Sequence, residues 1–216
     1  QAERFINTSG VFGRRRALLV GRGATALMLL YEALPEPGGR VILPAIGCPS
    51  LLATVLLTGR KPVIVDVDGN LNIDPKRVAE VIQPGDIVVA VHIFGIPCSV
   101  HELEDLCREN EAILIEDAAQ AVGAKAGEES RPVGTFGRAS ILSFSAGKIL
   151  PTQGGGAILA DDLDLLDSLK QKIDRLPALS SDLPRKAGKL RDILTDAFNE
   201  ARRDNPPAAS KFASVH

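Results

Sequence analysis

The stretch Asp86-Ile-Val-Val-Ala-Val91 is a nearly continuous apolar run that follows the turn Pro84-Gly85. Such runs are typical of strands that a sheet buries on both faces, because every side chain then meets apolar neighbours. A segment of helical character follows, from Ser99 to about Glu109, and then a second apolar run, Ala112-Ile-Leu-Ile115. A buried strand, a helix and another buried strand predict two parallel strands joined by a crossover helix.

The same alternation of strand-like and helix-like segments extends along most of the chain. The predicted strands are 17–20, 41–43, 61–65, 86–91, 112–115, 139–144 and 156–160. The predicted helices are 26–34, 50–57, 74–82, 99–109 and an amphipathic segment after Asp161. Short turns separate these elements, and Pro44 is expected to end the strand 41–43. The pattern favours an α/β fold with a mostly parallel, seven-stranded sheet and helices on both faces.

The pattern divides the chain into three parts. Residues 1–16 form a poorly patterned N-terminal segment, and residues 17–176 form the large α/β domain. Residues 177–216 are expected to contain a linker, an amphipathic helix whose apolar stripe runs from Leu190 to Phe198, and a fraying tail.

Composition and charge exclude several classes of protein. Hydrophobic residues make up 45% of the 216 residues, which is typical of a globular chain rather than a disordered one. The formal net charge is −2 and no basic block exceeds Arg14-Arg-Arg16, whereas nucleic-acid surfaces need clustered lysine and arginine. No run approaches the ~18 apolar residues of a membrane span. We therefore expect no nucleic-acid partner and no membrane segment.

The cysteines and histidines indicate no metal site. The chain has three residues of each type, which are Cys48, Cys98, Cys107, His92, His101 and His216. The number and spacing of the cysteines fit neither a disulfide framework nor a zinc site, and the histidines are scattered. A reducing, cytoplasmic location is therefore the simplest expectation.

Polar residues collect at the predicted carboxyl ends of the strands, where open parallel sheets hold their sites. Lys148 follows the strand 139–144 across the small residues Ser145-Ala-Gly147, and the glycine-rich stretch Pro151–Gly156 comes after it. A lysine at a rigid strand end under a flexible cover can hold an aldehyde as a Schiff base. By itself, a lysine in this context is more often a solvated loop residue.

The turn Gly21-Arg-Gly-Ala-Thr25 joins the first predicted strand to the first helix. Glycine and other small residues leave backbone N–H groups free at a helix N-terminus, which favours an anion, and Thr25 could add a hydroxyl group. Many α/β turns carry glycine without binding anything, so an ordinary turn is the alternative.

Three further side chains near strand ends suit one common ligand. Asp117 and Gln120 lie three residues apart after a predicted strand, and a helical turn there would direct both to one side. The carboxylate could pair with a protonated ring nitrogen, and the Ser143 hydroxyl could bind a phosphate. Each also has a structural explanation: a helix N-cap, a surface amide and an ordinary strand serine. Together with Lys148 and the Gly21–Thr25 turn, they predict a pyridoxal phosphate site.

Several segments of the chain occur in the order and spacing of one known protein family. They are Leu43-Pro-Ala45 with Gly59–Asp68, Val91-His-Ile-Phe-Gly95, Ile115-Glu-Asp-Ala-Ala-Gln-Ala-Val-Gly-Ala124, Gly134-Thr-Phe-Gly137 and Ser143-Phe-Ser-Ala-Gly-Lys148 with its glycine run. These segments resemble the DegT/DnrJ/EryC1/StrS family of fold-type-I, pyridoxal-phosphate-dependent sugar aminotransferases, from about residue 15 to about residue 170. The resemblance implies that 17–176 is the cofactor-binding large domain.

The resemblance also implies a role for each residue at the strand ends. Lys148 would be the Schiff-base lysine and proton carrier, and Asp117 would bind the pyridine nitrogen. The other cofactor-binding positions would be Gly23, Ala24, Thr25 and Ser143 for the phosphate, Gln120 for the ring hydroxyl or face, and His92 and Cys48 beside the ring. A structural core histidine is an equal explanation of His92. Cys48 stands where the family usually has an aromatic residue stacked on the ring.

The activity implied by the resemblance is transfer of an amino group from glutamate or glutamine to a keto sugar, expected to be nucleotide-linked, by a homodimer. The family's C-terminal small domain and Asn-Tyr-Arg segment have no counterpart in 177–216. The alternative is therefore a truncated or degenerate, non-catalytic binding or assembly module. Dehydration of a sugar is a third reading, which Lys148 disfavours because the family's dehydratase branch replaces that lysine.

Overall fold

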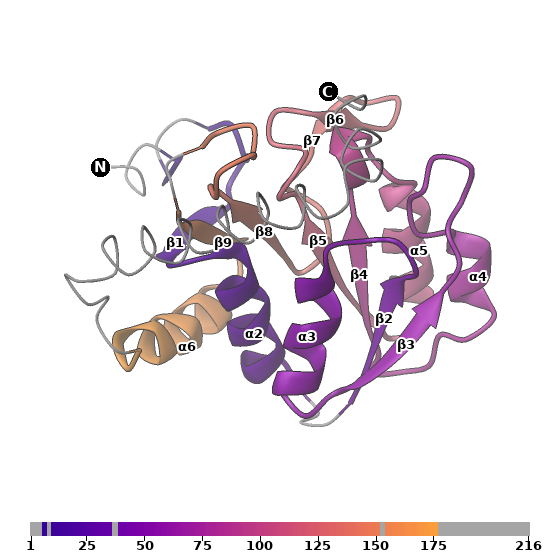
Figure 1. Ribbon diagram of the computed structural model, residues 1–216, viewed down its shortest axis with the longest axis horizontal. Coiled ribbons are helices and arrows are strands. Elements are labelled where there is room, and N and C mark those ends of the chain that lie inside the picture. The colour runs from indigo at the N-terminus through magenta and orange to yellow at the C-terminus, as the bar shows by residue number, and fades with distance from the viewer. Residues whose placement is uncertain (1–5, 8–9, 36–38, 152–153, 177–216) are drawn as a thin grey trace, which may run out of the picture. The chain divides into compact units, whose positions relative to one another are not determined.

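The computed structural model describes residues 6–7, 10–35, 39–151 and 154–176 (Figure 1). The chain divides into two units, Gln1–Arg175 and Leu176–His216, and the fold below is that of the first unit. The linker and the second amphipathic helix predicted within 177–216 lie outside the described residues.

The first unit contains a seven-stranded sheet in the order β1-β9-β8-β5-β4-β2-β3. Its strands are β1 (Arg16–Val20), β2 (Arg40–Pro44), β3 (Lys61–Val65), β4 (Ile87–Val91), β5 (Ile113–Asp117), β8 (Ala139–Ser143) and β9 (Gly156–Ala160). Neighbours from β8 to β3 pair in parallel, whereas β9 runs antiparallel to both β1 and β8. The predicted mostly parallel, seven-stranded sheet is confirmed.

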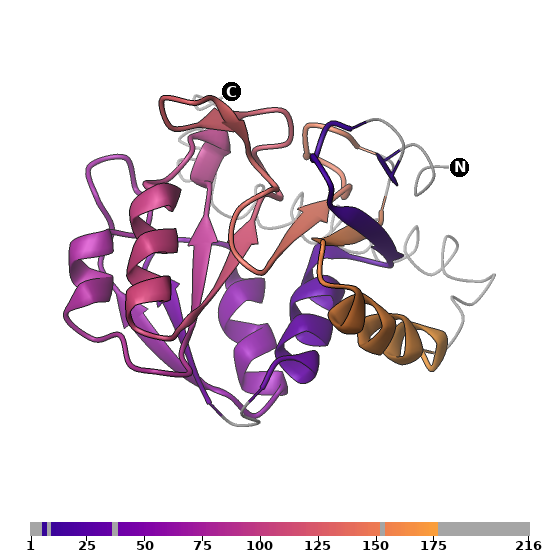
Figure 2. The ribbon, with the colours of Figure 1, turned by 180° about the vertical axis from the view of Figure 1, so that it is seen from behind.

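Helices cover both faces of this sheet, as predicted. The helices α2 (Gly23–Ala33), α3 (Pro49–Leu57) and α6 (Leu163–Asp174) pack on one face, with Leu27, Leu51 and Leu169 in its core. The helices α4 (Pro75–Ala79) and α5 (Val100–Glu109) pack on the other face, with Val78 and Leu103 in its core. Figure 1 shows α2 and α3 beside each other, and Figure 2 shows α4 and α5 from the opposite side.

Strand β4 explains why one apolar run predicts this architecture. All five of its residues are buried, and alternate side chains enter the two cores, with Val89 and Val91 on one face and Val88 and Ala90 on the other. Fully burying a valine contributes about 1.5–3 kcal/mol, so an apolar residue is favoured at every position and no polar alternation remains.

Several predicted boundaries are wrong by a few residues. α2 begins at Gly23 rather than Ala26, because the small residues after Arg22 already continue the helix. Pro44 is the last residue of β2 rather than the first residue after it. A proline is tolerated there because a residue at the end of a strand needs no N–H for pairing. α4 ends at Ala79, ahead of the predicted Ile82.

Two short elements escape the sequence pattern altogether. A hairpin pairs β6 (Lys125–Ala126) with β7 (Arg131–Pro132), and a 3₁₀ turn, η1, spans Ile93–Gly95. Strands of two residues are too short to show any periodicity. Residues 118–122 form turns rather than the helix considered after Asp117.

The sheet gathers the predicted polar residues at one edge. Gly156 of β9 pairs with Val20 on one side and with Ser143 on the other, so the ends of β1 and β8 lie level. Val91 and Asp117 pair in the same way at the ends of β4 and β5. The turns that leave these strands therefore meet above one edge of the sheet.

Candidate active site

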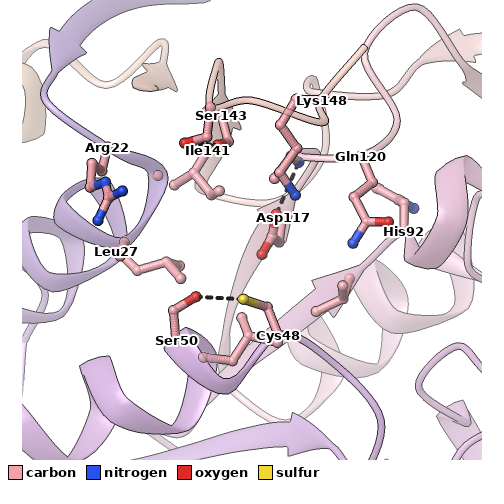
Figure 3. A pocket seen from close by; sticks show the side chains of 16 residues that line it. Arg22, Leu27, Cys48, Ser50, His92, Asp117, Gln120, Ile141, Ser143 and Lys148 are labelled. Carbon is pink, nitrogen blue, oxygen red and sulfur yellow. Dashed lines mark hydrogen bonds between the residues drawn. The ribbon is translucent and has the colours of Figure 1, made fainter. Parts of the chain in front are cut away.

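A pocket of about 280 Å³ opens at the carboxyl ends of β4, β5 and β8, between them and the N-terminal turns of α2 and α3 (Figure 3). It brings together most of the residues that the sequence singles out. Those that line it are Gly23, Ala24, Cys48, His92, Asp117, Gln120, Ser143 and Lys148. Thr25 is not among the lining residues; it is half-buried in the first turn of α2.

Lys148 reaches the pocket from a turn held by the glycine run. The Phe144 N–H donates to the Gly155 carbonyl at 3.0 Å, and the Lys148 N–H donates to the Ser145 carbonyl at 3.1 Å. The lysine side chain is half-buried, and Figure 3 shows it directed toward Asp117. An amine and a carboxylate thus face each other across a space open to a ligand.

Asp117 is the last residue of β5 and is 8% exposed. Burial raises the pKa of its carboxyl above the ordinary value of 3.8 and is the largest influence on it. The Ala119 N–H, which donates to Oδ1 at 2.9 Å, and the positive charge of Lys148 act in the opposite direction. Because burial outweighs them, the carboxylate still gains from a further cationic partner such as a protonated ring nitrogen.

The N-terminus of α2 and two serines form the other end of the pocket. Arg22 is the N-cap residue, and its side chain makes no capping hydrogen bond. Ser143 and Ser145 add hydroxyl groups whose oxygens lie 3.4 Å apart. Uncapped backbone N–H groups beside hydroxyl donors suit a phosphate.

The glycines at this end are required by close approach. A Cβ on Gly23 would lie 3.2 Å from the Ser143 Cβ, and one on Gly156 would lie 2.6 Å from the carbonyl carbon of Arg22. Side chains at either position would fill the space between α2 and the ends of β8 and β9. Gly156, the last residue of the glycine run, therefore has a packing role.

Cys48 and Gln120 both line the pocket. Cys48 is exposed at the N-cap of α3, and the Ser50 hydroxyl donates to its sulfur at 3.1 Å. The Gln120 side-chain oxygen accepts from the Phe94 N–H at 3.1 Å, which leaves its amide NH₂ to interact with a ligand.

His92 is a fully buried histidine on the pocket wall. Its Nδ1 accepts a hydrogen bond from the Cys98 N–H at 3.1 Å, so its proton is on Nε2. That Nε2 lies 2.9 Å from Oε1 of Glu116. The ring is fixed from both nitrogens, and both explanations of His92, core residue and ring neighbour, agree with its place.

Sequence reasoning missed several residues at this site. Ser50 and Ser145 line the pocket, and their signal is that each lies two residues from a predicted site residue, Cys48 or Ser143. Arg22, which also lines the pocket, belongs to the predicted turn Gly21–Thr25. Glu116 was also missed: it directly follows the predicted strand 112–115, and the sequence does not indicate its hydrogen-bond partners.

Among the residues that the structure describes, no group of three or more His, Cys, Asp or Glu could hold a metal ion. No helix in the same part of the chain is long and apolar enough to cross a membrane.

A seven-stranded sheet with a lysine and an aspartate at the ends of its parallel strands is the architecture of the fold-type-I pyridoxal phosphate enzymes. The chain belongs to the DegT/DnrJ/EryC1/StrS aminotransferase family, whose model matches residues 7–187. The expectation from the resemblance is confirmed at the level of family and fold.

Curated relatives include the GDP-perosamine synthase of Vibrio cholerae, which is 33% identical to this chain. The matched region covers 71% of this chain and 42% of the synthase. A dTDP-4-dehydro-2,6-dideoxy-D-glucose 3-dehydratase of Saccharopolyspora spinosa is also 33% identical, over 71% of this chain and 35% of its own length. The solved structure of DesI in the presence of its TDP-sugar product aligns with a TM-score of 0.71 and 32% identity, over 78% of this chain and 42% of DesI. The chain thus spans less than half the length of these relatives.

Proposed function

We propose that this chain carries the cofactor site of a pyridoxal-phosphate-dependent aminotransferase that moves an amino group from glutamate or glutamine to a nucleotide-linked keto sugar. The observation that carries the proposal is that Lys148, Asp117, Gly23 and Ser143 line one pocket. The names of the relatives, which include a GDP-sugar synthase and an enzyme solved with a TDP-sugar, support the substrate class.

The residues present fit the cofactor at each of its polar groups. Asp117 would pair with the pyridine nitrogen, and the backbone at Gly23 and Ala24 with the Ser143 hydroxyl would hold the phosphate. Gln120 would face the ring hydroxyl or ring face. Bound pyridoxal phosphate supplies an electron sink for the bond broken at the amino-bearing carbon.

Lys148 has two tasks in this proposal. Its amine would hold the cofactor aldehyde when no substrate is present. Once free, the amine would take a proton from the amino-bearing carbon of the donor, and in the second half of the cycle it would give a proton to the sugar carbon that receives the amino group. Its half-buried position next to Asp117 keeps the amine within the pocket. Thr25 would support the first turn of α2 rather than touch the phosphate, since it does not line the pocket.

Dehydration of a sugar is the second candidate, because one relative is named a 3-dehydratase. Lys148 favours transamination over this candidate. A primary amine at this place could bind the cofactor aldehyde again once the second half of an amino-transfer cycle has regenerated it. The resemblance implies another residue at this position in the family's dehydratase branch.

The test is cofactor capture. Purified protein mixed with pyridoxal phosphate should gain a visible absorption band, and borohydride should then fix the cofactor to the peptide that contains Lys148. Lys148→Ala should abolish both signals, while Lys125→Ala, which changes an exposed lysine of β6, should leave them intact. Absence of both signals from the unchanged protein would favour the non-catalytic module. Formation of a keto acid from glutamate or glutamine would then identify the amino donor.

A homodimer and a cytoplasmic location belong to the same proposal. Leu52, Leu56 and Leu57 of α3 are 41%, 58% and 73% exposed, and apolar surface of this kind is typical of a protein interface. The described cysteines are all free, as a reducing compartment requires. Sedimentation should give a dimer, and Leu56→Lys should shift it toward monomer.

A further inference from the structure

A network of hydrogen-bonded, buried polar side chains crosses the sheet next to the pocket, from β1 to β4. Arg15, which precedes β1, donates to the Leu159 carbonyl of β9 at 3.2 Å and to the Ser140 hydroxyl of β8 at 3.0 Å. The Ser140 hydroxyl donates to Glu116 Oε2 of β5 at 2.9 Å. Glu116 Oε1 in turn lies 2.9 Å from Nε2 of His92, which follows β4.

Glu116 is the centre of this network, and each of its two carboxylate oxygens has two hydrogen-bond partners. Its carboxylate receives His92 Nε2–H and the Gly134 N–H (2.8 Å) on Oε1, and the Phe136 N–H (2.9 Å) and the Ser140 hydroxyl on Oε2. The three N–H partners can only donate, so both oxygens of Glu116 accept hydrogen bonds. Arg15 supplies the opposite charge through Ser140.

The network ends at His92 on the pocket wall. Side chains alternate along a strand, so Glu116 faces one core while its neighbour Asp117 faces the pocket. The hydrogen bond from His92 fixes the imidazole as the Nε2–H form, with the Cys98 N–H on the other nitrogen. The backbone N–H of His92 also donates to the backbone carbonyl of Asp117 at 3.3 Å, and this bond connects the ends of β4 and β5.

Stability alone does not account for charges at this place. Apolar side chains of similar shape commonly stabilise a core as well as a buried ion pair does, because removing two charges from water is unfavourable. The carboxylate of Glu116 makes directional contacts that apolar side chains cannot make. Each of its oxygens accepts hydrogen bonds from two donors and so determines where those donors lie. Those donors belong to His92, which follows β4, to Ser140 of β8, and to Gly134 and Phe136 of the loop before β8. They surround β5, which ends at Asp117, and β8, which leads to the turn of Lys148.

We infer that Glu116 is a positioning residue for the cofactor site: with Arg15 as its counter-charge, it holds His92 and the ends of β5 and β8 where they present Asp117 and Lys148 to the cofactor. The inference rests on the proposed function for its ligand. The arrangement of the hydrogen bonds themselves does not depend on that function.

Glu116→Gln is the first test, since it keeps the shape and removes one acceptor. Whichever way the amide turns, its NH₂ faces a donor, either His92 Nε2–H with the Gly134 N–H, or the Phe136 N–H. In protein that circular dichroism shows to be folded, affinity for pyridoxal phosphate should fall about tenfold or more. Nitrogen NMR of the His92 ring should show Nε2–H in the unchanged protein without cofactor, and altered ring resonances in the variant.

Asp86→Asn is the matched control. Asp86 is a buried carboxylate at the other end of β4, where it accepts from Arg40 Nη2 at 3.0 Å and from the Gln83 N–H at 2.8 Å. This variant should lose thermal stability while the folded protein keeps its cofactor affinity and its His92 resonances. An equal affinity loss in Asp86→Asn, or an affinity within about twofold of the unchanged protein in Glu116→Gln, would overturn the inference.

A second variant covers the case in which Glu116→Gln does not fold. Ser140→Ala breaks the link between Arg15 and Glu116 and leaves the His92 contact in place, so the affinity should fall about threefold, and no fall would count against the inference. If the unchanged protein takes up no pyridoxal phosphate, the proposed function fails. The His92 spectrum still decides the arrangement, because a ring protonated on Nδ1 would overturn it.

Discussion

Gly23 lies so close to Ser143 that a Cβ on the glycine would stand 3.2 Å from the Ser143 Cβ and 3.5 Å from its hydroxyl oxygen. The first turn of α2 and the end of β8 therefore meet with no side chain between them. This contact leaves the backbone of the helix N-terminus and the serine hydroxyl facing the same space. The proposed phosphate position depends on it.

Gly23→Ala should separate stability from cofactor binding. Alanine is favoured over glycine in a helix by up to about 1 kcal/mol, and this gain offsets the tight contact with Ser143, so the unfolding free energy should change by less than about 1 kcal/mol. The new methyl group should move the Ser143 hydroxyl and weaken pyridoxal phosphate binding about tenfold. Titration of the cofactor absorption measures the affinity.

Gly21→Ala is the control for this change, because a Cβ on Gly21 meets nothing within 4 Å. It should leave both the affinity and the stability unchanged. Pyridoxal without its phosphate should bind the Gly23→Ala variant as well as it binds the unchanged protein. An equal loss for both ligands would argue against a phosphate at the α2 N-terminus.

Asp117→Asn should stabilise the protein in the absence of cofactor. Burial raises the pKa of Asp117 above 3.8, so the folded state holds the proton more tightly than the unfolded state does. Stability therefore falls as the pH rises from about 3.8 through the raised pKa, and the ionised carboxylate remains unfavourable at neutral pH. Asparagine removes this loss and should add about 1 kcal/mol at pH 7.

Denaturant unfolding at several pH values measures that difference. The gain should be present at pH 7, should shrink as the pH falls through the raised pKa of Asp117 toward 3.8, and should be absent below 3.8, where the carboxyl is neutral in both the folded and the unfolded state. The same variant should bind pyridoxal phosphate at least about tenfold more weakly, since the pyridine nitrogen loses its charged partner. A variant that is less stable at neutral pH and binds the cofactor normally would contradict both roles.

Apolar patterning accounts for how much of the fold could be predicted. A strand such as β4, buried on both faces, must be apolar throughout, and the helices between such strands require parallel order. Open parallel sheets hold their sites at the carboxyl ends of the strands. Asp117, Ser143 and Lys148 could therefore be predicted as site residues, because each ends or follows a buried strand. Their common edge was predictable, although the pocket's detailed lining was not.

Contacts between distant segments could not be predicted. Arg15 lies in the poorly patterned N-terminal segment and reaches Ser140, 125 residues away. That contact follows from the order β1-β9-β8, which places an N-terminal strand beside late ones. Glu116 was predicted only as the residue before Asp117, since its partners come from loops that carry no periodic signal.

Gly137→Ala should destabilise the fold strongly. Gly137 has φ 61°, and its Cβ would overlap the Leu114 carbonyl oxygen and lie 2.9 Å from the carbonyl carbon. The backbone conformation alone disfavours alanine by about 1–2 kcal/mol, and displacing a strand carbonyl adds to this. Gly59→Ala, with φ 71° and nothing within 4 Å, should show only the smaller loss. Equal midpoints in thermal unfolding would contradict the close contact.

Cys48 should be the fast-reacting thiol of the native chain. It is exposed, whereas Cys98 and Cys107 are buried, and burial raises the pKa of both, that of Cys107 to about 12. A thiol reagent at neutral pH should therefore modify Cys48 first, and denaturation should expose all three cysteines. Pyridoxal phosphate should slow the reaction, because Cys48 lines the pocket. Cys48→Ser should remove the fast phase.

Cys48→Tyr should strengthen cofactor binding. Cys48 is exposed and its side chain makes no capping bond to α3, so a larger residue needs no space in the core and removes no cap. An aromatic ring stacked on the cofactor is worth about 0.5–1.5 kcal/mol, which corresponds to a gain in affinity of about twofold to thirteenfold. Cys48→Leu adds apolar area without a ring and should gain less. Titration of the cofactor absorption compares the two variants, and equal gains would show that apolar area rather than stacking is what this wall of the pocket lacks.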